Sequence, residues 1–263
     1  MLSNVLMPSS AAEAAGLLRD GGWLLGGGTV VMPKVNTGAV PVSRLICLHR
    51  AGLAGITVNG GSVSVGAATT LGALGADDRL LFLHPVVRSI ASPPVRNLAT
   101  VGGNLFVAQP YGDLAVALLA LDARVEVVSA DGTREVPVGT PVEPTEVVTD
   151  LRFALPAGLW RYRKAMRRKH NSASIVTVAA ALTVTDGLVR TARIALGGVA
   201  PRPVRALAAE RALVGAPLDG PSVEAAAHAA SEGTEPFDDA YASAWYRARV
   251  LPVHVRRALL SEQ

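Results

Sequence analysis

Two glycine-rich segments constrain most strongly what this chain can fold into, because each brings bare backbone to a place where another group approaches closely. The first, Gly26-Gly27-Gly28-Thr29, follows a short apolar run, and the second, Gly102-Gly103-Asn104, lies later in the chain. Glycine lacks a Cβ atom, so successive N–H groups can point into one concavity and hold a phosphate or pyrophosphate. One Gly-Gly pair is more often an ordinary turn, but two such segments predict a grip on a long, doubly charged ligand.

A dinucleotide-binding Rossmann unit is one alternative for the first segment. Its fingerprint requires a further, spaced glycine and an acidic residue about 20 positions downstream. Here Gly26-Gly27-Gly28 is followed by Thr29-Val30-Val31, and no acidic residue lies at that distance. The segment therefore does not fit a Rossmann unit.

A longer pattern surrounds the second segment. Residues 90–105 have the sequence IASPPVRNLATVGGNL, and Ala108, Pro110 and Asp113 follow. This stretch resembles the FAD-binding segment of the molybdenum hydroxylase flavoproteins, the family that contains the medium subunit of carbon-monoxide dehydrogenase and the flavin domain of xanthine dehydrogenase. Further segments resemble that family in the same order, and the resemblance covers nearly the whole chain. They are 26–29, 65–70, 162–164, 167–168, 192–200 and 203–206.

The resemblance implies FAD as the cofactor and indicates which residues bind it, without assigning a catalytic residue. In this assignment the glycine segments hold the pyrophosphate, Asp113 accepts from the ribose hydroxyls, and a cation lies near N1 and the C2 carbonyl of the flavin ring. The implied residues are Leu25, Gly26, Gly27, Gly28, Thr29, Val30, Ile90, Ala99, Thr100, Val101, Gly102, Gly103, Asn104, Asp113, Val148, Arg163 and Lys164.

Two of these assignments have plainer alternatives. Asp113 precedes a predicted helix, so its carboxylate could cap that helix instead. Arg163 and Lys164 alternate on a predicted strand, so only one of them faces the flavin, and Arg163 is slightly favoured. The alternative for Arg163 and Lys164 is a solvated basic strand.

The chain also departs from the family pattern at several positions. Gln109 stands where the family usually has an aspartate, and Ser172 lies in a run where another aspartate is common. The segment 138–149 is rich in proline and lacks the usual pair of phenylalanines.

Composition limits the remaining classes of function. Half of the 263 residues are hydrophobic and 17% are charged, which suits a globular protein with a sizeable core and room for two domains. The lone Cys47 allows neither an internal disulfide nor a four-cysteine iron–sulfur cluster in this chain. The five histidines show no metal-ligand spacing, so no metal site is expected. They are His49, His84, His170, His228 and His254.

Charge and hydropathy patterns bear on partners and location. The net charge is +4, but the cations are dispersed except over 161–170, and only 4% of residues are aromatic. A base-stacking nucleic-acid surface is therefore not expected, and the basic run suits an anionic ligand or an acidic protein face. No apolar run is long enough to span a bilayer and no signal peptide is evident, so we expect a cytoplasmic protein.

The order of predicted elements, strands and then helices, indicates an α+β fold. Ser10 and Glu13 predict a capped helix, and Asn59-Gly60-Gly61 and Asp131-Gly132 predict hairpins. We expect an FAD-binding domain over 1–156, in two subdomains split near 55, and a C-terminal flavoprotein domain over 157–263. The C-terminal domain is expected to hold a three-stranded antiparallel sheet with helices. Its predicted strands are 159–167, 174–185 and 188–199, and its predicted helices are 204–214, 222–230 and 240–260.

Two functions remain open on the sequence. In the first, the chain is the FAD-binding subunit of a molybdenum-containing hydroxylase or dehydrogenase, and passes electrons from a 2Fe–2S partner through FAD to NAD or another acceptor. A large partner subunit would carry the molybdenum cofactor. In the second, the chain is a stand-alone FAD-dependent oxidoreductase acting on a small organic substrate, for example in secondary metabolism; the departures at Gln109 and Ser172 favour it. A scaffold that has lost its flavin is the residual alternative.

Overall fold

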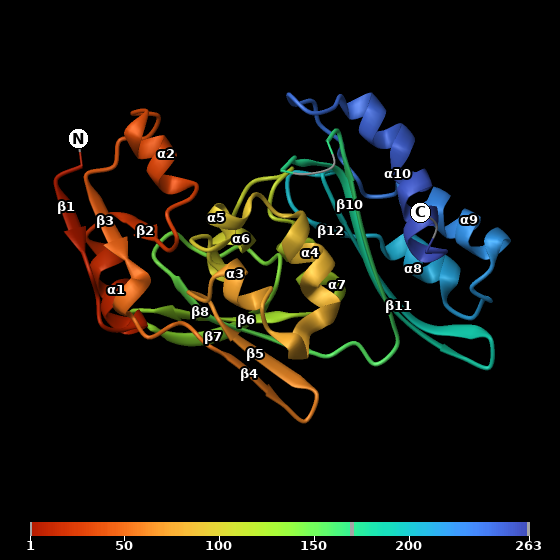
Figure 1. The fold of residues 1–263 in the computed structure, drawn as a ribbon, viewed down its shortest axis with the longest axis horizontal. Helices are drawn as coiled ribbons and strands as arrows, with labels where there is room; N and C mark the ends of the chain where they lie inside the picture. The colour runs from red at the N-terminus through yellow and green to blue at the C-terminus, as the bar shows by residue number, and fades with distance from the viewer. Residues whose placement is uncertain (1, 169–170, 262–263) are drawn as a thin grey trace. The chain divides into compact units, whose positions relative to one another are not determined.

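The computed structural model describes residues 2–168 and 171–261, so His170 lies outside the described residues (Figure 1). The chain forms two compact units, which interleave along the sequence. Unit 1 consists of Met1–Leu81, Ser92–Val107 and Arg124–Phe153, and unit 2 of Phe82–Ala91, Ala108–Ala123 and Ala154–Gln263. The domains over 1–156 and 157–263, with a split near 55, stay a prediction.

The N-terminal part of unit 1 is a small parallel sheet with one packed helix. Its strands are β1 (Asn4–Leu6), β2 (Trp23–Leu25) and β3 (Arg44–Cys47), in the order β1-β3-β2. Helix α1 (Ala11–Arg19) begins where the sequence predicts, because Ser10 Oγ accepts from the N–H of Glu13 at 3.1 Å. Its buried side chains pack with Ile46 of β3.

A five-stranded sheet forms the rest of unit 1, in the order β4-β5-β8-β6-β7. The strands are β4 (Ile56–Asn59), β5 (Ser62–Gly66), β6 (Arg124–Ser129), β7 (Gly132–Pro137) and β8 (Val147–Ala154). Both predicted hairpins are confirmed: β4 pairs with β5, and β6 with β7, each antiparallel. The short connecting helices are α2 (Val31–Asn36), η1 (Leu48–Arg50), α3 (Leu71–Leu74), α5 (Pro93–Arg96) and α6 (Val101–Leu105). The 3-10 segment η2 (Asp78–Leu83) runs from unit 1 into unit 2.

Unit 2 contains an antiparallel sheet of four strands in the order β12-β11-β10-β9. The strands are β9 (Leu159–Met166), β10 (Ser174–Thr185), β11 (Leu188–Gly197) and β12 (Val204–Arg205). The prediction of three strands was therefore wrong by one. Val204 and Arg205, which lie in the predicted helix 204–214, instead pair with Leu196 and Ala195, because the open edge of β11 offers unpaired backbone groups.

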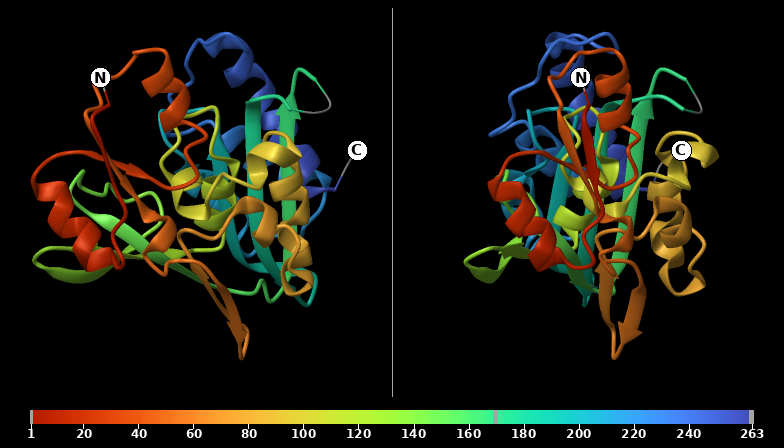
Figure 2. Two further views of the ribbon diagram at one scale, coloured as in Figure 1. Left: turned by 60° about the vertical axis from the view of Figure 1, so that its left-hand side comes forward. Right: turned by 90° about the vertical axis from the view of Figure 1, so that its left-hand side faces the viewer.

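Helices cover both faces of the unit 2 sheet (Figure 1, Figure 2). One face carries α4 (His84–Ser89) and α7 (Asp113–Ala120), and the other α8 (Leu207–Leu213), α9 (Gly220–Ala229) and α10 (Ala244–Leu259). Along β10, Val176 and Val178 pack into the cluster of α8–α10, whereas Ala179 packs with Val116 of α7. Burial on both faces explains why β10 is almost continuously apolar. Within the described residues, no helix is long and apolar enough to cross a membrane.

Candidate functional site

The first glycine segment connects β2 to α2 through a turn with unused backbone donors. Gly28 has a φ of +71°, in the left-handed region that favours glycine, and its carbonyl accepts from the N–H of Met32 at 2.9 Å. No acceptor within the described part of the chain is found for the N–H groups of Gly27, Gly28, Thr29 and Val30. A run of backbone donors without partners is suited to an anionic ligand.

The second glycine segment uses its donors inside the protein. Thr100 caps α6, and its Oγ1 accepts from the N–H of Gly103 at 3.1 Å. The N–H of Gly102 donates to the carbonyl of Ala67 at 2.8 Å, and a Cβ on Gly102 would lie 2.9 Å from the Cβ of Ala67. Gly102 therefore permits close packing on the turn that follows β5.

The two glycine segments lie directly against each other in unit 1. A Cβ on Gly27 would lie 1.7 Å from the carbonyl oxygen of Leu98, and one on Gly26 would lie 2.8 Å from Thr100 Oγ1. Gly103 is exposed, and a Cβ there would meet only Thr100 Oγ1, at 2.9 Å. The structure thus brings the predicted site residues 25–30 and 99–104 together.

Asp113 belongs to a buried polar cluster in unit 2. Its Oδ2 accepts from Lys164 Nζ at 2.8 Å, and its Oδ1 accepts from Thr177 Oγ1 at 2.7 Å. The side chains of Asp113 and Lys164 are only 5% and 4% exposed. Asp113 opens α7 after Gly112 but makes no capping bond with its side chain, so the capping alternative is not what the structure shows.

Tyr162 extends this cluster towards α4. Its hydroxyl lies 2.8 Å from Ser89 Oγ, while Lys164 Nζ donates to the carbonyl of Ser89 at 2.9 Å. Burial raises the pKa of Tyr162 well above its usual value, and the nearby Asp113 carboxylate adds to the effect. The cluster therefore ties α4 and α7 to the strands β9 and β10.

Arg163 and Lys164 lie on opposite faces of β9, as the predicted alternation requires. Lys164 faces Asp113, whereas Arg163 Nε donates to Nδ1 of His254, in α10, at 3.4 Å. Burial and, to a smaller extent, the cations of Arg163 and Arg257 together lower the pKa of His254 to about 4. Which of the two β9 cations contacts a flavin stays a prediction.

The remaining predicted residues are apolar. Ile90 ends α4 in unit 2 and Val148 lies in β8 of unit 1, and both are buried. Their predicted place beside the flavin ring stays a prediction.

Gln109 has a local structural explanation. Its Oε1 accepts from the N–H of Gly198 at 2.7 Å, and its Nε2 donates to the carbonyl of Tyr111 at 2.8 Å. An ionised aspartate cannot donate, so it could not make both bonds.

Sequence reasoning missed the neutral members of the buried cluster, Thr177 and Ser89. Thr177 is fully buried in the apolar run of β10. A lone hydroxyl in such a run is the pattern that could have indicated it, since a buried polar group needs a partner.

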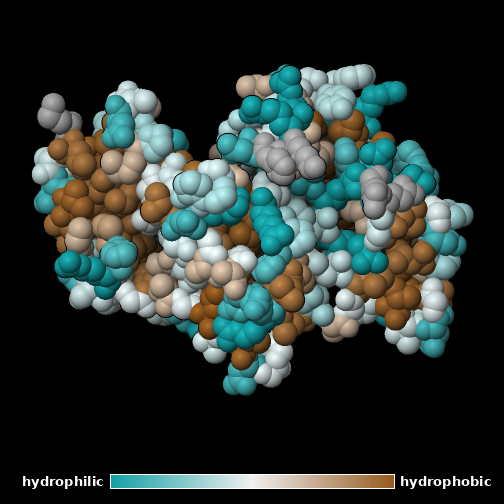
Figure 3. All heavy atoms as spheres, viewed as in Figure 1, coloured by the Kyte–Doolittle hydropathy of each residue, from teal (hydrophilic) through white to brown (hydrophobic). Residues whose placement is uncertain are grey.

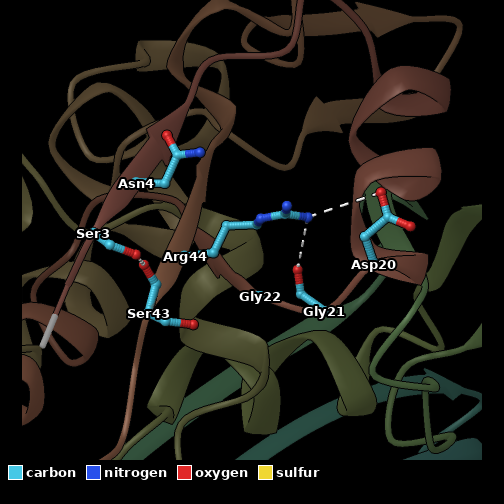
Figure 4. A pocket seen from close by; sticks show the side chains of 7 residues that line it. All are labelled: Ser3, Asn4, Asp20, Gly21, Gly22, Ser43 and Arg44. Atoms are coloured by element: carbon cyan, nitrogen blue, oxygen red, sulfur yellow. Dashed lines mark hydrogen bonds and ion pairs between the residues drawn. The ribbon is translucent and has the colours of Figure 1, made fainter.

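Each unit has a cavity within its described residues. The cavity in unit 1, of about 300 Å³, contains none of the predicted residues (Figure 4). There Arg44 Nη1 lies 3.5 Å from the carbonyl of Gly21 and 3.9 Å from the carboxylate of Asp20. The cavity in unit 2, of about 390 Å³, lies along β9 and includes Tyr162 and Arg163.

In the part of the chain that is described, no group of histidine, cysteine or acidic residues is arranged to hold a metal ion.

Comparisons with known proteins agree over almost the whole chain. Residues 2–149 match the family described as the FAD binding domain in molybdopterin dehydrogenase, and residues 160–261 match the CO dehydrogenase flavoprotein C-terminal domain. The carbon monoxide dehydrogenase medium chain of Afipia carboxidovorans is 32% identical over 96% of this chain and 93% of its own. A 6-hydroxypseudooxynicotine dehydrogenase complex subunit alpha from Paenarthrobacter nicotinovorans is 30% identical over 97% and 92%. The solved carbon monoxide dehydrogenase from Hydrogenophaga pseudoflava matches with a TM-score of 0.94 and 31% identity, over 100% of this chain and 97% of that one.

Proposed function

The chain belongs to the family of FAD-binding domains of molybdopterin dehydrogenases, and from this premise we propose that it takes electrons from an iron–sulfur partner chain and delivers them to NAD or another acceptor. It is an FAD-binding oxidoreductase subunit of the molybdenum hydroxylase family. The identity of the acceptor, and a cytoplasmic location, belong to the proposal.

The assignment of an FAD site in this chain rests on the first glycine segment. Its N–H groups from Gly27 to Val30 have no acceptor among the described residues, which is what a pyrophosphate requires of its cradle. The second segment supplies a rigid wall of this site, because the N–H groups of Gly102 and Gly103 are already hydrogen-bonded to Ala67 and Thr100. Because Gly103 is exposed and has no side chain, a ligand can approach the backbone at this position.

Bound FAD supplies the exchange of single electrons on one side and of electron pairs on the other. The residues of this chain hold and orient the cofactor. The Asp113–Lys164 pair has its oxygens and ammonium engaged by Thr177 and Ser89, so its observed role is to hold α4 and α7 on the sheet. A ribose contact by Asp113 stays a prediction.

Surface composition supports partner chains. Figure 3 shows hydrophobic surface over the β1-β3-β2 sheet, where Val5 and Trp23 are exposed. In unit 2, Trp245 of α10 is 68% exposed. Exposed apolar surface of this kind is typical of faces that other proteins cover. We propose an iron–sulfur small subunit and a molybdenum-cofactor large subunit as those partners, which fits the names "medium chain" and "complex subunit" of the relatives.

The site is tested by placing a charge in the proposed anion cradle. Thr29→Asp adds a carboxylate beside the unused donors, and Thr29→Asn is the neutral control of the same size. Repulsion of about 1–3 kcal/mol, from two charges some 5 Å apart at the effective dielectric near a protein surface, predicts a loss of FAD affinity of roughly 10- to 100-fold for the aspartate alone. The measurement is titration of the apoprotein with FAD, followed by flavin fluorescence.

Folding is checked by thermal unfolding of each apoprotein, which should be the same for both variants. Equal FAD affinity of the aspartate and asparagine variants would remove the first glycine segment from the site. A released flavin that is not FAD would overturn the cofactor assignment itself.

A further inference from the structure

The cavity along β9 in unit 2 has a lining that the proposed function does not explain. It lies at the free edge of the four-stranded sheet, since β9 is the last strand, and α4 and α10 contribute its other walls. Its lining includes three arginines and no acidic residue. Only Arg163 and its neighbour Tyr162 belong to the segment that the family resemblance places near the flavin.

Two of the arginines carry uncompensated charge. In the described residues, neither Arg161 nor Arg257 has an ion-pair partner, and Arg161 Nη1 donates only to the carbonyl of Trp160, at 3.2 Å. The preceding residue of α10, Arg256, has such a partner, with its Nε 3.3 Å from the carboxylate of Glu224. Side chains at adjacent helix positions point in different directions, so Arg256 faces an acid while Arg257 lines the cavity.

Two unused donors belong to residues that line this cavity, at adjacent positions of β9. Four buried side-chain nitrogen or oxygen atoms in the described part of the chain lack a hydrogen-bond partner, and two belong to lining residues, Trp160 Nε1 and Arg161 Nε. Buried polar atoms are almost always paired, so two unpaired donors among the lining residues indicate that a partner is missing.

The local field already favours an anion. The ring of His254 lies beside Arg163, and the cations of Arg163 and Arg257 add to burial in lowering the pKa of His254 to about 4. An oxyanion at the cavity would offset this positive field, and guanidinium groups bind both carboxylates and phosphates through paired N–H donors.

We propose that the β9 cavity, lined by Trp160, Arg161 and Arg257, binds a small organic oxyanion that carries a carboxylate or a phosphate group. Its volume of about 390 Å³ exceeds what one inorganic ion needs and lies in the range of sites for small organic molecules. The apolar parts of Trp160, Pro85 and Ala258 would cover the body of the ligand, and the guanidinium groups would bind its charged end.

The test uses the FAD-loaded protein, so that the first glycine segment is already occupied. Inorganic pyrophosphate and succinate serve as separate probes in isothermal titration calorimetry, and whichever binds identifies the class of charged group. Arg257→Gln and Arg161→Gln should each weaken binding by about tenfold or more, because each removes a charged donor pair. Trp160→Phe keeps an aromatic side chain but removes the indole N–H, and should give a smaller loss.

The matched control is Arg190→Gln, which removes an arginine paired with Asp186 at an exposed hairpin of the same unit. This variant should bind as the unaltered protein does, and all variants should keep their flavin. Equal affinity across every variant, or no binding of either probe, would overturn the proposal. Neither result would bear on the assignment of the FAD site, which the Thr29→Asp variant tests independently.

Discussion

The glycines of the two glycine segments have different roles. Substituting them one at a time distinguishes an effect on packing from an effect on access of the ligand. Gly27→Ala places a Cβ on the carbonyl of Leu98, so the loops must move apart. We expect unit 1 to lose about 1–3 kcal/mol of unfolding free energy together with its FAD. The free energy is measured by urea unfolding and the flavin by absorbance.

Gly103→Val is the companion variant. Its side chain starts at an exposed position where the only close atom is Thr100 Oγ1, so the fold should lose no more than the cap contributes, about 1 kcal/mol. FAD affinity should still fall, because the branched side chain occupies the face that the backbone offers the ligand. A fully flavinated Gly103→Val protein would contradict the site.

The buried pair Asp113 and Lys164 gives a prediction with a built-in control. Asp113→Asn leaves the ammonium without a counter-charge, and Lys164→Met does the same to the carboxylate, so each should cost about 3–5 kcal/mol. The double variant should cost clearly less than the sum. Urea unfolding of the apoprotein measures this double-mutant cycle. If the single variants unfold like the unaltered apoprotein and lose only FAD, the ribose contact is favoured over the structural role.

His254 makes stability depend on pH. Its pKa is about 4 in the folded protein and 6.5 when unperturbed, so between these values the unfolded chain binds more protons. The unfolding free energy should therefore fall as the pH drops from 6.5 to 4, with no further loss from this group below 4. His254→Gln should flatten that slope in urea unfolding across the window. An unchanged slope would show that His254 titrates normally.

At the scale of elements, Arg247 fastens α10 to the sheet. The side chain is fully buried, and its Nη1 donates to the carbonyls of Ile175 at 2.6 Å and Gly198 at 2.9 Å. Its Nη2 donates to Asp239 at 2.7 Å. Burial acts to raise the pKa of Asp239, but the N–H groups of Ala242 and Tyr241 and the guanidinium outweigh it, so the pKa is lowered. One charged side chain thus joins a helix, a strand and a loop.

Arg247→Met should release α10 from β10, because it removes the donor to Asp239 Oδ2 and to the carbonyls of Ile175 and Gly198. We expect a loss of about 3–5 kcal/mol and faster hydrogen exchange across α10. Arg249→Met is the control, since Arg249 is exposed on the same helix and only lies over the Trp245 ring. It should change stability by less than about 0.5 kcal/mol. Similar exchange rates in the two variants would contradict the fastening role.

At the scale of the whole molecule, the chain is expected to bind FAD alone but to turn over only with partners. We predict little flavin reduction by substrates of molybdenum hydroxylases when the chain is expressed by itself. Co-expression with iron–sulfur and molybdenum-cofactor subunits should restore reduction, measured by stopped-flow absorbance. Rapid reduction of the isolated chain by a small organic molecule would instead support a stand-alone oxidoreductase.

The sequence alone predicted the features that depend on a few neighbouring residues. The start of α1 at Ser10, the hairpins at Gly60 and Asp131, and the glycine segments all depend on local backbone preference, which acts over two to four residues. The family and its cofactor followed because the pattern around the second glycine segment is long and ordered.

Only the tertiary structure decided the pairings between distant residues. It placed Gly27 against Leu98, joined Lys164 rather than Arg163 to Asp113, and turned Val204–Arg205 into a fourth strand. Each outcome depends on which strand edge or helix face lies opposite. A sequence pattern states which residues share a face, but the partner of that face is chosen by packing across the whole unit.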